Sequence, residues 1–435
     1  MSTVRRDLGI LQDRRFVLLL AARTISMLGS AFAPVALAFG VLALPGATAT
    51  TLSAVLTAEA LPMVALMLVG GVLADRLPRH WVIAMSEGAN AAAYSALAVM
   101  MLTGWTPLPA LIAASAASGI AGALLYPALT GIIPEVVSAE RLQAANALIG
   151  LGGNSARVAG LVLSGGAVVL LGAGWSLAAS GAMFAVAGVL VALLRQPRAR
   201  GGGVEGAEGA GGTAGAGRSS VLADLREGWR EFVSRQWLWV VVAQFSMMVL
   251  AIQAAHGVLG PLIARDELGG APAWSAVLAG EALGMIFGVV VSIRLRPRRP
   301  ILVGTLLTLP TALPYVALGV GAPLWMIVAG AFVMGVCFDV FGVLWSTTLQ
   351  REIPPESLSR VGSYDALGSL ALGPIGLMLA GPAAVLVGPH AALLGCAAIV
   401  LLVSLAALLA PGVRNLRAPD GTRATAPADA AASPL

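Results

Sequence analysis

The amino-acid sequence predicts an all-α membrane protein with twelve transmembrane helices in two pseudo-symmetric six-helix bundles. Three features predict this fold class: the composition, the apolar segments and an internal repeat. Of the 435 residues, 58% are hydrophobic and only 11% are charged, whereas a soluble domain carries about 25% charged residues. So few charged side chains cannot cover a particle in water, and most of the surface is therefore expected to face lipid.

Twelve segments of the chain are long and apolar enough to cross a membrane, because a transmembrane helix needs about 20 mostly apolar residues. The first is long, which favours a retained helix over a cleaved signal peptide. The fifth and eleventh are the most polar, since both begin with polar residues and are rich in glycine. The predicted spans are residues 16–41, 51–74, 82–103, 107–132, 142–172, 175–195, 237–263, 274–293, 300–319, 323–347, 362–388 and 390–410.

Arginine supplies all 26 basic residues, and its distribution predicts the orientation of the chain. The loops and termini on one side of the predicted spans hold 23 arginines. The opposite loops hold only Arg265, while Arg23 and Arg157 lie inside spans. Cytoplasmic loops are enriched in basic residues, so we expect a multi-pass protein of the bacterial cytoplasmic membrane with both termini in the cytoplasm. The arginines do not form one basic face, which argues against nucleic acid as a partner.

The composition divides the chain into four parts. Residues 1–196 and 237–411 are expected to form the N-terminal and C-terminal six-helix bundles. Residues 197–236 are expected to form a cytoplasmic linker that begins as a flexible stretch of mostly Gly, Ala, Arg and Glu. Its later part, residues 219–233, has the apolar face of a helix that lies on the membrane surface. The tail, residues 412–435, is rich in Ala and Pro and is expected to be a disordered cytoplasmic segment.

The two halves of the chain repeat each other. Glu59 in the second span and Glu281 in the eighth are both followed by Ala and Leu. Alignment of the first and seventh spans by hydropathy sets Arg23 against Gln244, and the charged turn after the second span has a decayed partner at residues 294–299. The repeat supports two bundles joined by the linker.

A tight charged turn separates the second and third spans, and it carries a motif. The pattern is G-x-L-x-D-R-x-x-R, supplied by Gly71, Leu73, Asp75, Arg76 and Arg79. This turn resembles the loop between helices two and three of the major facilitator superfamily of transporters. Two residues depart from the family pattern: Pro78 stands where Gly is usual, and His80 stands where Lys or Arg is usual.

The resemblance covers nearly the whole chain and implies the major facilitator fold. Within the superfamily, residues 23–30 and 349–354 resemble the bacterial exporter-like branch that includes siderophore exporters and macrolide efflux permeases.

The resemblance also implies a cytoplasmic gate motif made of Gly71, Asp75, Arg76 and Arg79. We expect Asp75 to lie near Gly362 and Ser363, at the start of the eleventh helix, where the positive helix end favours an anion. We expect Arg79 to pair with Glu135.

Ionisable side chains inside the spans are the candidates for a transport site, since a charge at bilayer depth normally faces the bundle interior or a wet cavity. Glu87 and Asp365 lie near the cytoplasmic ends of their helices, so a structural role is the first interpretation of both. The proton and substrate cavity is expected to contain Arg23, Glu59, Arg157, Asp339, Glu281, Asn154 and Gln253.

Glu59 is the first candidate for a proton acceptor, because a carboxyl group in an apolar site binds a proton more readily than one in water. Asp339 is the second candidate, and His256 could also titrate. Among the basic residues inside the spans, we expect Arg157, rather than Arg23, to be the cavity partner of Glu59. The fourth span lacks the arginine that many drug/proton antiporters of the superfamily carry, so if protons drive transport, the acceptor must be another group.

These features predict a secondary active transporter that exports small hydrophobic organic molecules, such as drugs, siderophores or secondary metabolites, by proton-coupled alternating access. We expect a monomer in the lipid bilayer, with no enzymatic activity, no cofactor and no metal site. The sequence has no phosphate-binding loop for ATP and no large soluble domain. Two alternatives stay open: an uptake carrier of the same fold, and a transport-inactive membrane sensor or scaffold.

Overall fold

The computed structural model describes residues 8–138, 141–194 and 229–417. The described part of the N-terminal half is helical and contains no strand. A short 3-10 helix, η1 (Leu8–Gln12), precedes six long helices: α2 (Arg14–Leu42), α3 (Ala49–Arg76), α4 (Arg79–Thr103), α5 (Leu108–Val136), α6 (Leu142–Leu171) and α7 (Ala173–Ala192).

The C-terminal half also crosses the bundle six times, but three of its spans are composite. The seventh span joins α9 (Gln236–Ala254), the π-helical turn η3 (Ala255–Leu259) and α10 (Gly260–Glu267). The ninth joins α12 (Pro300–Leu307), η4 (Leu309–Ala312) and α13 (Leu313–Gly319), and the eleventh joins α15 (Pro355–Leu370) and α16 (Gly373–Val387). The remaining elements are α11 (Ala271–Arg294), α14 (Leu324–Glu352), α17 (Pro389–Leu409) and the short α18 (Pro411–Asn415).

The predicted spans match these helices closely. Eleven of the described spans are long and apolar enough to cross a membrane by length and composition. Helix α4, with 25 residues, is the twelfth, and its buried Ser86, Glu87 and Asn90 make it more polar. Span ends agree with the prediction to within five residues, except that the eleventh span begins at Pro355 rather than residue 362. Proline is favourable in the first turn of a helix, so α15 starts before the apolar stretch does.

Prolines explain the interruptions of two composite spans, the ninth and the eleventh. Pro310 and Pro314 lie in the first turns of η4 and α13, and Pro374 lies in the first turn of α16. Proline cannot donate the backbone hydrogen bond of a helix interior, so the breaks in the ninth and eleventh spans fall where a proline begins the next segment.

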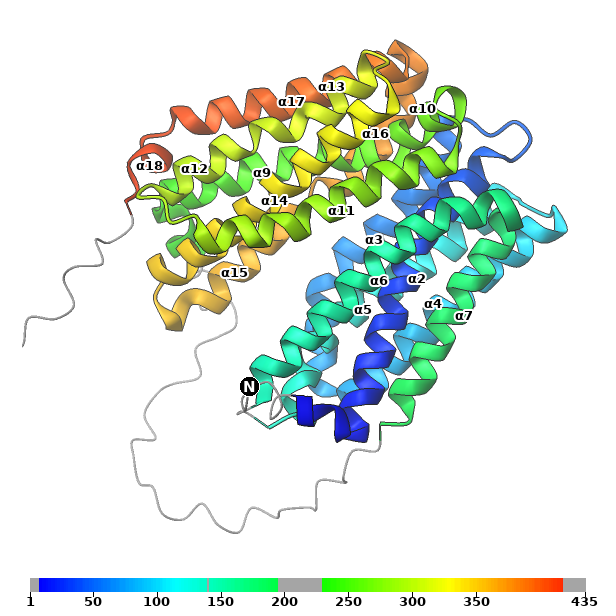
Figure 1. The fold of residues 1–435 in the computed structure, drawn as a ribbon, viewed down its shortest axis with the longest axis horizontal. Coiled ribbons are helices and arrows are strands. Elements are labelled where there is room, and N and C mark those ends of the chain that lie inside the picture. The colour runs from blue at the N-terminus through cyan, green and yellow to red at the C-terminus, as the bar shows by residue number, and fades with distance from the viewer. Residues whose placement is uncertain (1–7, 139–140, 195–228, 418–435) are drawn as a thin grey trace, which may run out of the picture.

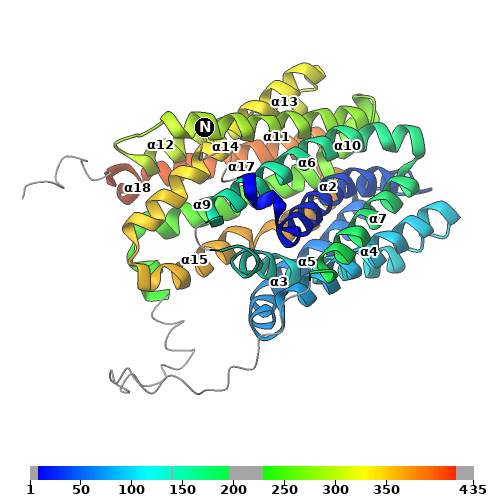
Figure 2. The same cartoon turned by 60° about the horizontal axis from the view of Figure 1, so that its bottom comes forward.

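The two halves lie side by side and approach each other most closely at one end (Figure 1). We name the end that carries η1 and α18 the terminal end, and the opposite end, with α10 and the α2–α3 connection, the distal end. Toward the terminal end the ribbons of the two bundles lie farther apart (Figure 1). Both views place α6 beside α11, and α3 packs against α16 (Figure 2).

Contacts at the distal end join the halves directly. The Ser53 hydroxyl donates a hydrogen bond to the Leu377 carbonyl oxygen, and the Gly381 N–H donates to the Ser53 oxygen over 3.3 Å. Arg265 donates to the Leu42 carbonyl oxygen over 3.1 Å. A Cβ added at Gly381 would meet the backbone of α3, so only glycine permits this approach of the two helices.

Only part of the expected linker can be compared with the structure. The flexible stretch and most of the surface helix lie outside the described residues, as does the tail from residue 418. Residues 229–234 are helical, and Phe232, 6% exposed, packs with Trp237, Ile353 and Val361 of the C-terminal half. The described end of this helix therefore packs against the C-terminal half through Phe232, while Trp229 is 53% exposed.

Candidate functional site

A cavity of about 440 Å³ lies between the two halves and brings together charges from both. Its walls come from α2, α3 and α6 on one side, and from the seventh span, α11 and α16 on the other. Most of its lining is apolar and includes Leu56, Met63, Trp274 and Leu278. The polar and charged residues of the lining are Ser30, Glu59, Arg157, Gln253, His256 and Glu281. The sequence predicted Glu59, Arg157, Gln253 and Glu281 as cavity residues.

Glu59 is held on the cavity wall by two hydroxyl groups of its own half. The Tyr94 hydroxyl donates to Glu59 Oε1 over 3.0 Å, and the Ser118 hydroxyl lies 3.3 Å from the same oxygen. Ser118 also lies 3.0 Å from Asn90 Oδ1, and the Tyr94 ring packs against Phe184. Three helices, α3, α4 and α5, thereby fix the position of one carboxyl group.

The expected pairing of Glu59 with Arg157 is absent among the described residues. Both side chains line the central cavity, but Arg157 makes no hydrogen bond or ion pair with any residue that the structure describes. Tyr94 and Ser118 satisfy Glu59 instead, since hydroxyl groups stabilise a carboxylate without bringing a second charge out of water.

His256 and Glu281 form a second polar contact in the cavity. His256 Nε2 lies 3.6 Å from Glu281 Oε2, and the imidazole ring packs between Trp274 and Tyr315. The π-helical turn η3 carries His256, and such turns often occur at functional sites because they shift the side chains of a helix out of register. The histidine is therefore fixed between an acid and two aromatic rings.

Arg157 also faces a small cavity of about 60 Å³, which it shares with Asn154 and Asp339. The Asp339 Oδ2 atom is buried and has no hydrogen-bond partner among the described residues. A guanidinium group and a carboxyl group that line the same cavity attract each other across it. The structure thus places Asp339, Asn154 and Arg157 together at the contact between α6, α11 and α14.

A third cavity, of about 460 Å³, lies within the C-terminal half and connects Asp339 with Asp365. The Trp345 indole N–H donates to Asp365 Oδ2 over 3.0 Å, and the Ser369 hydroxyl lies 3.3 Å from Asp365 Oδ1. Asp365 is therefore anchored, as its structural interpretation expects, but it also lines a cavity.

Aromatic rings form much of this third cavity, and the sequence analysis did not identify them. The Phe245 and Phe341 rings are stacked with centroids 5.7 Å apart, and Phe341 and Trp345 are stacked at 6.3 Å. The available signal is their spacing in α14, where Phe338, Phe341 and Trp345 follow one another at three and four residues and so share a helix face.

Arg23 does not line the central cavity, which corrects its predicted place there. It lies near Glu87 inside the N-terminal half. The Ser26 hydroxyl donates to Glu87 Oε1 over 2.7 Å, and Glu87 is only 2% exposed. Ser26 and Glu87 therefore form a buried polar pair inside the N-terminal half, and the partly buried Arg23 lies beside it.

The C-terminal half has a polar cluster at the equivalent place. Gln244, which aligns with Arg23, donates through Nε2 to Thr308 Oγ1 over 2.9 Å and to Ser404 Oγ over 3.2 Å. The internal repeat therefore extends to side-chain contacts, with a neutral cluster in one half and a charged cluster in the other.

The gate motif lies at the terminal end, at the junction of α3 and α4. Arg79 Nη1 donates to Glu135 Oε1 over 2.8 Å, so the predicted pairing of these two residues is confirmed. Helix α3 runs through Gly71, Asp75 and Arg76, whose side chains lie outside the described part of the structure. The expected approach of Asp75 to Gly362 and Ser363 therefore stays a prediction.

Comparison with known protein families gives one match that covers most of the chain. The sequence profile of the Major Facilitator Superfamily matches residues 16–367. One curated relative, the enterobactin exporter EntS of Shigella dysenteriae serotype 1 (strain Sd197), is 26% identical over 336 residues, which cover 72% of this chain and 74% of that protein.

Solved structures of transporters share the fold. The nucleoside transporter NupG superposes with a TM-score of 0.70 at 14% identity, covering 91% of this chain and 98% of that chain. A bacterial homologue of the human lysosomal transporter Spinster, in an inward-facing and unoccupied conformation, gives a TM-score of 0.65 at 16% identity, covering 91% and 96%. A POT family transporter in complex with a thioalcohol-conjugated peptide gives 0.70 at 12%, covering 91% and 95%.

Proposed function

Because the chain belongs to the major facilitator superfamily and is a multi-pass membrane transporter rather than an enzyme, we propose that it is a proton-coupled exporter of small hydrophobic organic molecules. The observation that carries this proposal is the position of Glu59 on the wall of the cavity between the halves. An exchange of substrate for a proton needs one group that binds the proton in the same space that the substrate occupies.

The lining of the central cavity supports a hydrophobic organic substrate. Small-molecule sites are mostly apolar, with a few polar groups that orient the ligand. Here Trp274, Leu278, Leu56 and Met63 supply apolar area next to Glu59. A sugar or a small inorganic anion would need a denser set of polar groups, so the lining favours molecules that partition into membranes.

Two carboxyl groups of the central cavity have different surroundings, and those of Glu59 suit the proton step. Glu59 accepts hydrogen bonds from Tyr94 and Ser118, which can follow its change of charge by rotating their hydroxyl hydrogens. Glu281 faces His256 across 3.6 Å in the same cavity. We propose Glu59 as the coupling residue and the Glu281–His256 contact as a polar group that orients the substrate.

Alternating access is proposed to come from rocking of the two halves about their contacts. In the described structure the halves touch at the distal end through Ser53, Leu377 and Gly381. We propose that the gate motif, with Asp75 and Arg79, forms the corresponding closure at the terminal end when the distal end opens. The bundles at residues 1–196 and 237–411 are then the two moving bodies.

Export from a bacterial cytoplasm is the proposed direction. The arginine distribution supports cytoplasmic termini, so that the terminal end faces the cytoplasm and the distal end faces outward. One relative is named an enterobactin exporter, which supports export over uptake. We propose a monomer in the cytoplasmic membrane as the working unit.

The experiment that tests the proposal is a transport assay in inverted membrane vesicles. Vesicles with and without the chain are given an imposed pH gradient and a panel of hydrophobic organic compounds. Accumulation that requires both the chain and an acidic lumen supports proton-coupled export. Chain-dependent loss of preloaded compound from vesicles that have the same acidic lumen supports the uptake carrier, because a symporter moves compound and proton in the same direction. No chain-dependent flux for any compound supports the sensor or scaffold.

A further inference from the structure

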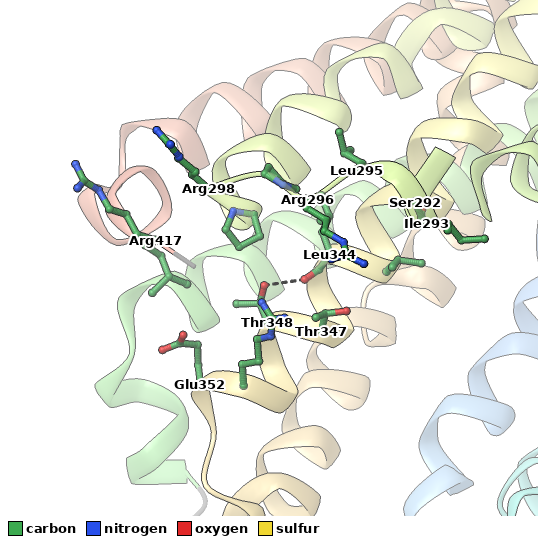
Figure 3. Close-up of a pocket in the computed structure, with 15 residues that line it drawn as sticks. Ser292, Ile293, Leu295, Arg296, Arg298, Leu344, Thr347, Thr348, Glu352 and Arg417 are labelled. Carbon is green, nitrogen blue, oxygen red and sulfur yellow. Dashed lines mark hydrogen bonds between the residues drawn. The ribbon is translucent and has the colours of Figure 1, made fainter. Parts of the chain in front are cut away.

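We propose that a basic cavity at the terminal end of the C-terminal half binds an anion that carries a phosphate group. The cavity measures about 590 Å³ and is separate from the central cavity, with which it shares no lining residue. It lies between the end of α11, the start of α12, the end of α14 and the segment after α18 (Figure 3). The proposal is therefore independent of the transport function.

Four arginines from three separate segments line this cavity. Arg296 and Arg298 come from the α11–α12 loop, Arg351 from α14 and Arg417 from the segment after α18. Glu352 is the one acidic residue of the lining, so four positive charges face one negative charge. The arginines in Figure 3 enter from more than one side of the cavity. The four guanidinium groups repel one another across the cavity, and an anion bound between them would offset this repulsion.

The guanidinium groups have open hydrogen-bonding capacity. None of these four arginines makes a hydrogen bond or ion pair with any residue within the described ranges. Some other arginines of the chain do have such partners: Arg79 pairs with Glu135, and Arg235 with Glu231. Each guanidinium carries five N–H donors in a planar fork that matches the oxygens of a phosphate group. Several such forks around one cavity suit an anion with three or more acceptor oxygens better than a single carboxylate.

The local backbone holds the donors in place. Pro297 and Pro300 flank Arg298 and lie in the cavity wall, and proline restricts the backbone dihedral angle of a loop. The Thr348 and Ser292 hydroxyls donate to backbone carbonyl oxygens of their own helices, which leaves the arginines as the main donors. A loop restricted in this way loses less conformational entropy when it binds an anion.

Apolar residues beside the arginines indicate where such an anion would come from. Ile293 is 71% exposed, Val343 is 38% exposed, and both line the cavity next to Leu295. Helices α11 and α14, which carry two of these residues, are membrane-spanning. A phosphate headgroup among the arginines would therefore place its acyl chains along an apolar wall, whereas free phosphate would use only the charged part.

The test measures binding to the purified full-length chain in detergent. Phosphatidylglycerol, phosphatidylcholine and inorganic phosphate are supplied in separate arms, with retained lipid counted by native mass spectrometry and phosphate binding measured by calorimetry. The test variant is R296Q/R351Q, and the matched control is R294Q/R299Q, which removes the same charge from the same region but changes no lining residue. We expect phosphatidylglycerol to bind, and its affinity to fall about tenfold or more in the test variant alone.

The binding results either support the phosphate site or overturn it. Binding of inorganic phosphate that depends on Arg296 and Arg351, without binding of phosphatidylglycerol, keeps the phosphate site and assigns a soluble source. Equal losses in the test and control variants, or no saturable binding of either ligand, would overturn the proposal. If R296Q/R351Q fails to fold, R298Q/R417Q removes the other two arginines and gives the same comparison.

Discussion

The Tyr94 hydroxyl donates a hydrogen bond over 3.0 Å to the Glu59 carboxyl group, and this contact joins the buried interior of the N-terminal half to the central cavity. Tyr94 is only 5% exposed and packs on Phe184, so its hydroxyl has a fixed position. Glu59 thereby has a rigid donor on one side and the open cavity on the other.

Replacing Glu59 with glutamine is expected to abolish transport driven by a pH gradient, because the amide keeps the size of the side chain but cannot bind and release a proton. Accumulation in inverted vesicles measures this effect. E267Q, at the exposed distal end, is the matched control and should keep the wild-type rate. If E59Q retains gradient-driven accumulation, the proton role belongs elsewhere, and Asp339 is the next residue to replace.

Replacing Tyr94 with phenylalanine is expected to keep transport but to move its pH profile toward higher pH. The carboxylate loses one of its two hydroxyl donors, so release of the proton becomes less favourable. The measurement is the initial transport rate across a series of pH values. F184L, which alters the packing beside Tyr94 and spares the hydroxyl, should leave the profile in place, and identical profiles for Y94F and wild type would contradict the assigned contact.

Replacing Ser26 with alanine is expected to destabilise the folded chain by about 1–3 kcal/mol, because the buried Glu87 carboxylate loses a hydrogen-bond donor. Unfolding by denaturant in detergent gives the free energy of unfolding. S30A, one turn farther along α2 and exposed to the central cavity, should change it by less than about 0.5 kcal/mol. Equal effects of S26A and S30A would count against the buried cluster.

Replacing Gly381 with leucine is expected to separate the halves at the distal end, since a side chain there would collide with Thr50 and Ser53. The measurement is the distance between spin labels at Thr48 and Val387, which should lengthen. G395L is the control, because a Cβ at Gly395 meets nothing within 4 Å. An unchanged distance in G381L would show that this contact does not hold the distal end closed.

Replacing Asp75 with asparagine is expected to lower transport without abolishing membrane insertion, because the proposed gate loses its anion while the helix remains. The measurements are the flux in vesicles and the amount of chain in the membrane fraction. Wild-type flux in D75N would reject the gate role.

Replacing Arg79 with glutamine should change the free energy of unfolding by less than about 1 kcal/mol, since Arg79 and Glu135 are both partly exposed.

The sequence alone determined the number and extent of the spans, the internal repeat and the Arg79–Glu135 pair. Hydropathy and helix length are properties of consecutive residues, so they can be predicted without knowledge of the packing. Arg79 and Glu135 could be paired because the turn after α3 and the end of α5 must reach the same end of the bundle when the helices alternate in direction.

The tertiary structure alone decided which way each charged side chain faces. The helices of this chain are apolar on nearly every side, so periodicity carries little information about which face meets the cavity. Packing therefore determined that Arg23 lies near Glu87 inside its own half, while Arg157 lines the cavities between the halves. Tyr94 and Ser118 became partners of Glu59 for the same reason: they belong to other helices, and only the approach of α3, α4 and α5 brings their hydroxyl groups to one carboxyl group.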